Sequence, residues 1–286
     1  MAENFYTLLK KTKPLKVVGT INAYSALLAE KSGLEALYIS GAGVANASYG
    51  IPDLAMTSKD NVLEDLRRIK GVSDLPVLVD CDTGWGSALS ISKTTKDMIL
   101  AGAAGIHIED QVSNKRCGHR PNKEIVSSEE MVDRIKASAD SANENFLLMA
   151  RTDAFVKEGI NGVIDRCNSY IEAGANAIFP EAIVNLSEYK KLSENLNVPI
   201  LANITEFGLT PLFTDKELSE AGVDIILHPL SAFRAMSRAA EEIYNEISKE
   251  GTVEKKIKKM QSRDELYSVL NYHTYEEKID NLFSKE

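Results

Sequence analysis

The chain has 286 residues, of which 44% are hydrophobic, and a formal net charge of −9. Its length and apolar content allow a large core within a single domain, because α/β barrels often reach this size. The acidic balance argues against nucleic acid or an anionic membrane as a partner. It does not exclude a small anionic substrate, since local cations or a metal ion can reverse the sign within a pocket.

The cysteines are Cys81, Cys117 and Cys167, and no two of them have the CxxC spacing. This small odd set indicates neither a disulfide framework nor a zinc cluster. The first residues, MAENFYTLLKKTKP, lack the apolar run of a secretory signal. No stretch has the roughly 18 consecutive apolar residues of a membrane span. We therefore expect a soluble cytoplasmic protein in a reducing compartment.

Eight short runs rich in Val, Ile or Leu recur along the chain, as expected for strands that are buried on both faces. They cover residues 16–23, 36–40, 76–82, 105–110, 146–154, 177–182, 199–205 and 224–230. Helix-like segments lie between them. One has Ser58 as a candidate N-cap and Gly71 as a candidate stop, and another has Ser127 and Glu130 at capping-box spacing.

The sequence AGA occurs at residues 101–103 and 173–175, and the variant AGV occurs at 221–223, each time just before an apolar run. This repetition indicates a recurring turn from helix to strand. The alternation predicts an α/β fold, a (β/α)8 TIM-type barrel that forms a single domain over residues 1–286. The rival, a doubly wound open sheet, normally has a GxGxxG motif that is missing here. Residues 231–286 exceed the needs of a barrel, so we expect C-terminal helices that cover it or pack on a neighbouring subunit.

Polar side chains end most of the apolar runs. They are Ser40, Asp80, Asp82, Glu109, Asp110, Arg151, Asp153, Glu181, Asn203 and Thr205. In a barrel of this type the carboxyl ends of the strands and the following loops form the active site. Because i and i+2 share a strand face, Asp80 and Asp82 point the same way and Cys81 points away. Two such carboxylates suit Mg²⁺, with Glu109 accepting from metal-bound water. The alternative is that these acids cap helices or bind loop amides.

The segment EDQVSNKRCGHRP, residues 109–121, surrounds Cys117 with Lys115, Arg116 and His119. Positive neighbours lower the pKa of a thiol from about 8.5 toward neutrality, which suits a proton donor. Residues 111–125 show no periodicity and are too many for a simple βα turn, so we predict a lid. The alternative is an exposed basic loop with an incidental cysteine.

The motifs DCDTGWG, IEDQ, KRCGH, FPEA and NITEFG, in this order, resemble the isocitrate lyase and phosphoenolpyruvate mutase superfamily, and within it the 2-methylisocitrate lyase group. The similarity runs from GTINAY to SRDELY. It implies a Mg²⁺-dependent lyase that cleaves 2-methylisocitrate, a small anionic tricarboxylate, to pyruvate and succinate in the methylcitrate cycle of propionate catabolism. It also implies a homotetramer whose paired subunits exchange a C-terminal helix.

The resemblance also implies residue roles. Asp80 and Asp82 are the metal-binding acids, with Asp53 and Glu109 nearby; Ser40, Gly41, Ala42 and Arg151 receive the pyruvate portion; Glu181, Asn203, Ile204, Thr205, Arg234 and Arg263 hold the succinate portion; and Gly118 lies on the lid beside Cys117, the proton donor. Tyr38, or a group acting through it, is the expected base. Lys115, Arg116 and His119 are expected to tune the thiol or to meet the substrate carboxylates.

Three residues, Ala42, Cys81 and Trp85, depart from the pattern of the relatives, and we expect Ala42 and Trp85 to reshape the pocket. Isocitrate lyase remains an alternative, although it is generally longer and carries tryptophan where Phe179 stands. A 2,3-dimethylmalate lyase also remains open. Phosphonomutases and oxaloacetate-type relatives lack the KRCGH cysteine, and a non-catalytic metabolite-binding barrel would not need the acids.

Overall fold

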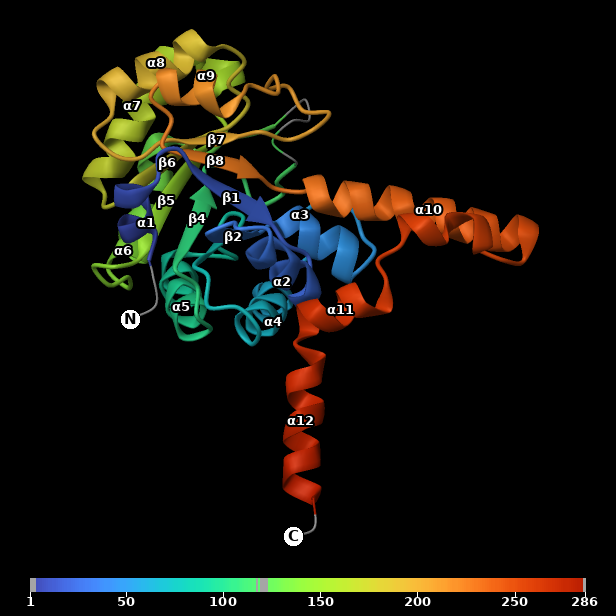
Figure 1. The fold of residues 1–286 in the computed structure, drawn as a ribbon. Helices are drawn as coiled ribbons and strands as arrows, with labels where there is room; N and C mark the ends of the chain where they lie inside the picture. Colours follow the sequence, from blue (N-terminus) through green and yellow to red (C-terminus); the bar gives the residue numbers. More distant parts are fainter. Residues whose placement is uncertain (1–3, 117, 119–122, 285–286) are drawn as a thin grey trace.

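The computed structural model describes residues 4–116, 118 and 123–284, and its centre is a parallel eight-stranded sheet (Figure 1). The strands are β1 Leu15–Gly19, β2 Ala36–Ile39, β3 Val77–Asp80, β4 Gly105–Glu109, β5 Leu147–Thr152, β6 Ala177–Pro180, β7 Leu201–Asn203 and β8 Ile225–His228. Their order is β6-β5-β4-β3-β2-β1-β8-β7. A parallel bridge between Ile178 and Ile200 joins the two ends of this order. All eight apolar runs therefore form strands, and the predicted barrel fold is confirmed.

Helices surround the strands. They are α2 Ala23–Lys31, α4 Lys59–Lys70, α5 Ala88–Leu100, α6 Ser128–Ala139, α7 Phe155–Glu172, α8 Leu186–Asn195 and α9 Asp215–Glu220, with α1 Phe5–Lys11 before β1, and with α3 Gly41–Gly43 and a π-helical turn Val44–Ser48 after β2. The Ser58 side chain accepts a hydrogen bond from the Asn61 amide at the start of α4. The Ser127 side chain does the same for Glu130 at the start of α6. Both predicted N-caps are confirmed.

Apolar side chains form two layers on the two faces of the sheet. Outward-facing residues such as Val79 and Ile106 pack against the helices. Inward-facing residues such as Leu78 and Met149 fill the barrel, together with Phe5 of α1. Cys81 belongs to the outer layer, as strand alternation predicts.

The repeated AGA-like turn has one backbone basis. Gly102, Gly174 and Gly222 adopt φ values of 97°, 113° and 83° at the ends of α5, α7 and α9. Side chains disfavour this left-handed conformation, so glycine stands at each of these helix ends. Each turn then leads the chain into the next strand, which places all carboxyl ends of the strands at one side of the barrel.

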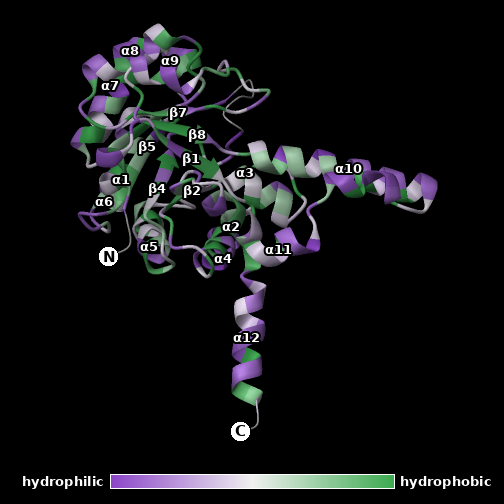
Figure 2. Cartoon of the chain, viewed as in Figure 1, coloured by the Kyte–Doolittle hydropathy of each residue, from purple (hydrophilic) through white to green (hydrophobic). Residues whose placement is uncertain are grey.

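The last helices are α10 Ser231–Glu250, a 3₁₀ turn Glu254–Lys259, α11 Arg263–Leu270 and α12 Tyr272–Phe283, and none of them contains a buried residue. Of the last helices, α10 and α12 project away from the barrel, whereas α11 lies against α2 (Figure 1). The end of α12 is apolar on part of its surface (Figure 2). Within the described chain, no helix is both long enough and apolar enough to cross a membrane.

Candidate active site

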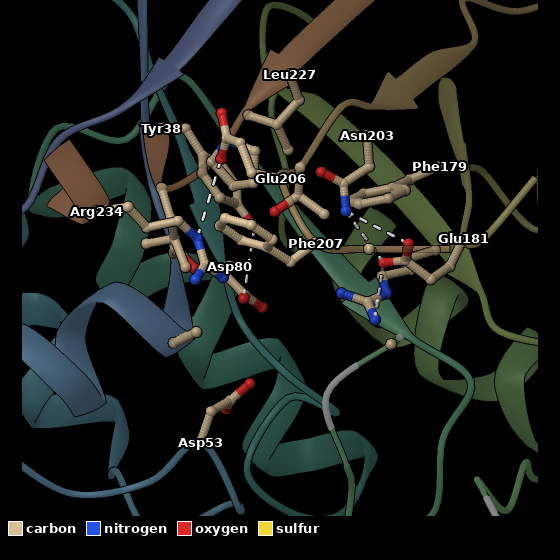
Figure 3. A pocket seen from close by; sticks show the side chains of 18 of the residues that line it. Tyr38, Asp53, Asp80, Phe179, Glu181, Asn203, Glu206, Phe207, Leu227 and Arg234 are labelled. Carbon is tan, nitrogen blue, oxygen red and sulfur yellow. Dashed lines mark hydrogen bonds and ion pairs between the residues drawn. The ribbon is translucent and has the colours of Figure 1, made fainter. Parts of the chain in front are cut away.

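A cavity of about 300 Å³ opens at the carboxyl ends of the strands (Figure 3). Most of the candidate residues line it, namely Tyr38, Ser40, Ala42, Asp53, Asp80, Lys115, Gly118, Arg151, Phe179, Glu181, Asn203, Thr205 and Arg234. They come from strands and loops far apart in the sequence. The barrel therefore gathers around one space the residues that the sequence marks at its strand ends.

Two acidic side chains converge beside the first loop of the site. The Gly41 amide donates to Asp80 Oδ2 over 2.9 Å, and a Cβ added to Gly41 would lie 3.0 Å from both Asp80 Oδ2 and Asp82 Oδ1. Asp82 follows the end of β3 and has a left-handed φ of 48°. The turn, and not strand alternation alone, therefore brings its carboxylate next to that of Asp80.

Lys115 inserts an ammonium group among these acids. Its Nζ lies 2.5 Å from Asp82 Oδ1 and 2.9 Å from Asp53 Oδ1. Burial raises the pKa of Asp82 to about 7 in spite of the opposing charge of Lys115. Burial also acts on Asp80, but nearby positive charge, including that of Lys115, keeps the pKa of Asp80 below its usual value.

The acid cluster contains more carboxyl groups than Lys115 pairs with. Both carboxylate oxygens of Glu109 are buried and accept no hydrogen bond within the described part of the chain. Burial raises the pKa of Glu109 well above its usual value, against the charges of Arg151 and Lys115. The described residues form no group of three or more His, Cys, Asp or Glu placed as a closed metal cage. Mg²⁺ keeps several waters and needs only one or two carboxylates, so the acids present fit this ion.

Tyr38 is linked to a histidine that the sequence analysis did not select. Its hydroxyl lies 2.9 Å from His107 Nε2 and 3.4 Å from Asp80 Oδ2. His107 is fully buried, and burial lowers its pKa to about 4, so its imidazole is neutral near pH 7. One signal in the sequence could have indicated His107. It lies two residues before Glu109 on the apolar run 105–110, so both side chains share a strand face.

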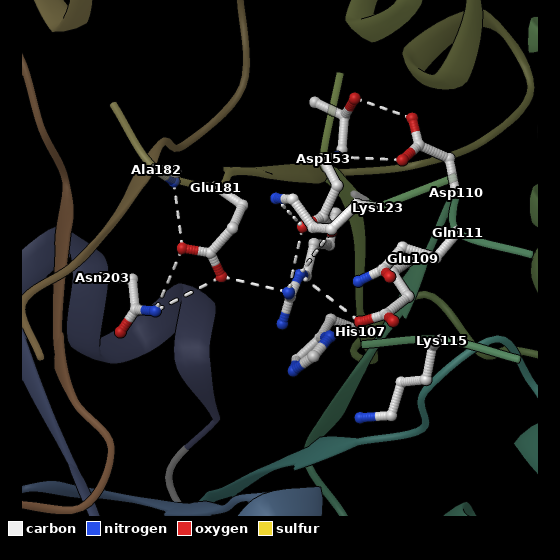
Figure 4. A network of polar contacts seen from close by, with 12 residues as sticks. His107, Glu109, Asp110, Gln111, Lys115, Lys123, Asp153, Glu181, Ala182 and Asn203 are labelled. Carbon is white, nitrogen blue, oxygen red and sulfur yellow. Dashed lines mark hydrogen bonds and ion pairs between the residues drawn. The ribbon is translucent and has the colours of Figure 1, made fainter. Parts of the chain in front are cut away.

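Arg151 forms ion pairs with Glu109, Asp153 and Glu181 in a second polar cluster, and Figure 4 shows how these three acids lie. Arg151 Nη2 is 3.1 Å from Glu181 Oε2, and the guanidinium lies over the Phe179 ring, 5.1 Å from the centroid. Asn203 Nδ2 donates to Glu181 Oε1 over 3.3 Å. A Cβ added to Gly118 would come within 2.4 Å of Arg151 Nη2, so the loop can approach Arg151 this closely only with glycine.

Of the remaining candidate residues, only some of those that the structure describes line the cavity. Arg234 lines the cavity and lies over the ring of Phe207, 5.5 Å from its centroid. The side chain of Ile204 packs in the outer apolar layer and does not line the cavity. Arg263 is exposed at the start of α11, away from the cavity of this chain. Cys117 and His119 lie outside the described residues.

Of the three departures, Cys81 packs in the outer layer and does not line the cavity, as expected. Ala42 lines the cavity, as expected. Trp85 does not line it: its indole Nε1 donates to the Thr57 carbonyl over 3.1 Å and the side chain packs against the outer layer. The expectation that Trp85 shapes the pocket is therefore wrong, because the left-handed turn at residues 84–86 carries the indole toward the loop before α4.

The eight-stranded barrel and its acid-lined cavity are features of a known protein family, which comparisons of the sequence identify. The family model of phosphoenolpyruvate phosphomutase matches residues 5–248, and the chain belongs to this family. Within it, the chain is 56% identical to a 2-methylisocitrate lyase of Escherichia coli (strain K12), over 98% of this chain and 96% of that protein. It is 54% identical to a 2-methylisocitrate lyase of Salmonella typhimurium, over 98% and 95%.

Solved structures of more distant relatives share the whole fold. A 2,3-dimethylmalate lyase matches with a TM-score of 0.88 and 29% identity, over 97% of this chain and 93% of that one. An oxaloacetate acetylhydrolase in complex with 3,3-difluorooxalacetate matches with a TM-score of 0.91 and 28% identity, over 100% and 97%. A phosphonopyruvate hydrolase in complex with oxalate and Mg²⁺ matches with a TM-score of 0.83 and 25% identity, over 97% and 96%.

Proposed function

We propose that this chain is a Mg²⁺-dependent lyase that cleaves 2-methylisocitrate to pyruvate and succinate. The observation that carries the proposal is the 56% identity to the E. coli 2-methylisocitrate lyase over nearly the entire chain. The cavity supports the same reaction class, because it combines carboxylates for a hard cation with cations for an anionic substrate. The proposed metabolic role is propionate catabolism through the methylcitrate cycle. The proposed location is the cytoplasm.

The pyruvate half of the substrate would bind between Arg151 and the loop of residues 40–42. A guanidinium offers a planar pair of donors that matches a carboxylate. Asp80 and Asp82 would hold Mg²⁺, with Glu109 and Asp53 placed to accept from its waters. When bound, the ion would polarise the substrate oxygens and stabilise negative charge that develops on them.

Tyr38 and His107 would remove the proton of the substrate hydroxyl. Tyr38 lines the cavity, and Nε2 of His107 lies 2.9 Å from its hydroxyl oxygen. A neutral imidazole can accept the phenolic proton while the phenolic oxygen takes the proton of the substrate. His107 would therefore be the group that acts as a base through Tyr38.

Loss of that proton lets the hydroxyl oxygen form the carbonyl of pyruvate while the neighbouring C–C bond breaks. The electron pair of this bond stays on the succinate portion as a carbanion conjugated with its carboxylate. Glu181, Asn203, Thr205 and Arg234 line the side of the cavity where this portion would lie. Cys117 would supply the proton that completes succinate, and a closed lid would keep bulk water from the carbanion.

One experiment tests the substrate. The release of 2-oxo acid, trapped with phenylhydrazine, is measured for 2-methylisocitrate, isocitrate and 2,3-dimethylmalate. We expect the highest kcat/KM with 2-methylisocitrate. A higher kcat/KM with isocitrate or with 2,3-dimethylmalate would contradict the proposal; the second outcome has support in the likeness to the 2,3-dimethylmalate lyase structure.

We also propose that the helices after residue 230 pack on a neighbouring subunit within a homotetramer. Large apolar side chains on α12 have little contact with the barrel: Tyr275 is 67% exposed and Phe283 is 78% exposed. Such exposure is unusual for an isolated chain and is typical of a surface that another subunit covers. Arg263, which does not line the cavity of its own chain, would then be available to a site in the assembly.

A further inference from the structure

Asp153 lies between the active-site arginine and a lysine from the end of the lid segment. One of its oxygens, Oδ1, is 2.6 Å from Lys123 Nζ, and Oδ2 accepts from Arg151 Nε over 3.0 Å. Arg151 Nη2 also donates to Oδ1 over 3.3 Å. The side chains of Lys123 and Asp153 are 6% and 0% exposed, so water cannot substitute for either partner.

A short antiparallel contact holds the base of the lid in place. Val112 donates its amide to Glu124 O over 3.0 Å, and Val126 donates to Asp110 O over 2.8 Å. This pairing fixes the backbone next to Lys123 against the end of β4. The ammonium of Lys123 therefore reaches Asp153 from a fixed point, as Figure 4 shows.

The lid segment approaches Arg151 from a second direction as well. Gly118 is buried, and it stands so close to Arg151 Nη2 and to Glu181 that a Cβ would overlap both. Arg151 Nη1 has no hydrogen bond to a described residue, so it remains available to a ligand. The guanidinium is thus contacted directly by Gly118 and, through Asp153, by Lys123.

Charge balance decides how strongly Asp153 holds Arg151. Three buried carboxylates face the guanidinium, namely Glu109 at 3.4 Å, Glu181 at 3.1 Å and Asp153 at 3.0 Å. Lys123 neutralises the negative charge of Asp153. Without Lys123 the full charge of Asp153 would act on Arg151, because charges interact strongly in a site that excludes water. The guanidinium would then turn toward Asp153 and away from the cavity.

We propose that Lys123 is a positioning residue: by sharing Asp153 with Arg151, it keeps the guanidinium oriented toward the carboxylate of the pyruvate half. This inference rests on the proposed function in one respect, the assignment of Arg151 to that carboxylate. It can be tested with oxalate, a dicarboxylate that imitates the pyruvate half, without any turnover.

The test is titration calorimetry of the full-length protein with oxalate in the presence of Mg²⁺, and the same titration with succinate is the comparison. We expect Lys123→Met to weaken oxalate binding by about tenfold to a hundredfold and to leave the dissociation constant of succinate unchanged. Lys123→Arg, which keeps the charge, should retain oxalate binding. The double variant Lys123→Met/Asp153→Asn should regain most of it, because no unbalanced carboxylate remains to draw Arg151 aside.

The matched control is Lys13→Met. Lys13 Nζ lies 2.6 Å from Asp224 Oδ1 at the opposite end of the barrel, so it is also a short Lys–Asp pair, but one without a contact to the site. We expect no change in oxalate binding. The inference would be overturned if Lys123→Met lost equal affinity for oxalate and for succinate, or if its affinity for oxalate were unchanged. If Lys123→Met does not fold, weak oxalate binding by the double variant overturns it instead.

These outcomes differ from a failure of the proposed function. An unmodified chain that binds oxalate but releases no pyruvate from 2-methylisocitrate would contradict the substrate and leave the Lys123 comparison in force. An unmodified chain that binds no oxalate would overturn the inference together with the assignment of Arg151.

Discussion

The hydroxyl oxygen of Tyr38 lies 2.9 Å from Nε2 of His107, inside the barrel and next to the acid cluster. The two rings stack with an interplanar angle of 14°, and His107 contacts the Phe179 ring edge-on. Packing on two sides therefore fixes the imidazole, and its Nε2 faces Tyr38 and Asp80. This geometry makes the tyrosine–histidine pair the candidate for proton removal.

Replacement of Tyr38 by phenylalanine should lower kcat by about 10²- to 10⁴-fold, the range for loss of a general base, with a smaller effect on KM. The phenyl ring keeps the packing against His107 but cannot transfer a proton. Steady-state kinetics with 2-methylisocitrate measures the effect. Tyr6→Phe is the control, because it also removes a tyrosine hydrogen bond, to Phe146 O, outside the cavity. Similar kcat values for the two variants would exclude Tyr38 as the base.

Replacement of Cys117 by alanine or serine should leave folding and Mg²⁺ binding intact and nearly abolish cleavage. The reason is that alanine has no proton to donate and that a serine hydroxyl is far less acidic than a thiol. Succinate formation is the measurement, with thermal unfolding as the check of the fold. Cys167→Ser serves as the comparison, since Cys167 is buried in the outer layer. Near-normal turnover by Cys117→Ala would rule out the donor role.

Removal of divalent metal with EDTA should stop the release of 2-oxo acid, and added Mg²⁺ should restore it. Without the ion, the buried carboxylates of the site would face an anionic substrate directly. Binding of Mg²⁺ alone, followed by calorimetry, gives a readout that does not depend on turnover. Asp80→Asn should weaken this binding, whereas Asp97→Asn on α5 should not. Full activity after exhaustive chelation would contradict the metal requirement.

Truncation after Asn271 removes α12 and should lower the oligomeric state, because the proposed partner surface is lost. Light scattering coupled to gel filtration measures the mass of the assembly. The barrel itself should keep its circular dichroism spectrum, since α12 contributes no buried residue. A point variant, Phe283→Asp, tests the same surface without a deletion. An unchanged assembly in both variants would remove α12 from the interface.

Much of the fold follows from local sequence patterns. The apolar runs, the capping serines and the glycines of the AGA-like turns act over a few residues, so they are visible without knowledge of the partners in space. The acids and amides at the strand ends are visible for the same reason, because a barrel places every such end at one mouth. The positions of Tyr38, Asp80, Arg151 and Glu181 around the cavity were predictable on this basis.

Other features depend on which side chains meet after the chain has folded. In the sequence, His107 is one more residue of a buried strand. Only the structure shows that its imidazole faces Tyr38. Trp85 seemed to belong to the pocket, but a left-handed turn directs it elsewhere. Lys115, expected to tune a thiol or to meet the substrate carboxylates, pairs with Asp82 and Asp53. By itself the sequence determined the barrel and the chemical groups at its mouth, because periodicity and turns are local; only the tertiary structure decided how these charges pair, since each pair joins residues from separate strands and loops whose distances the sequence does not contain.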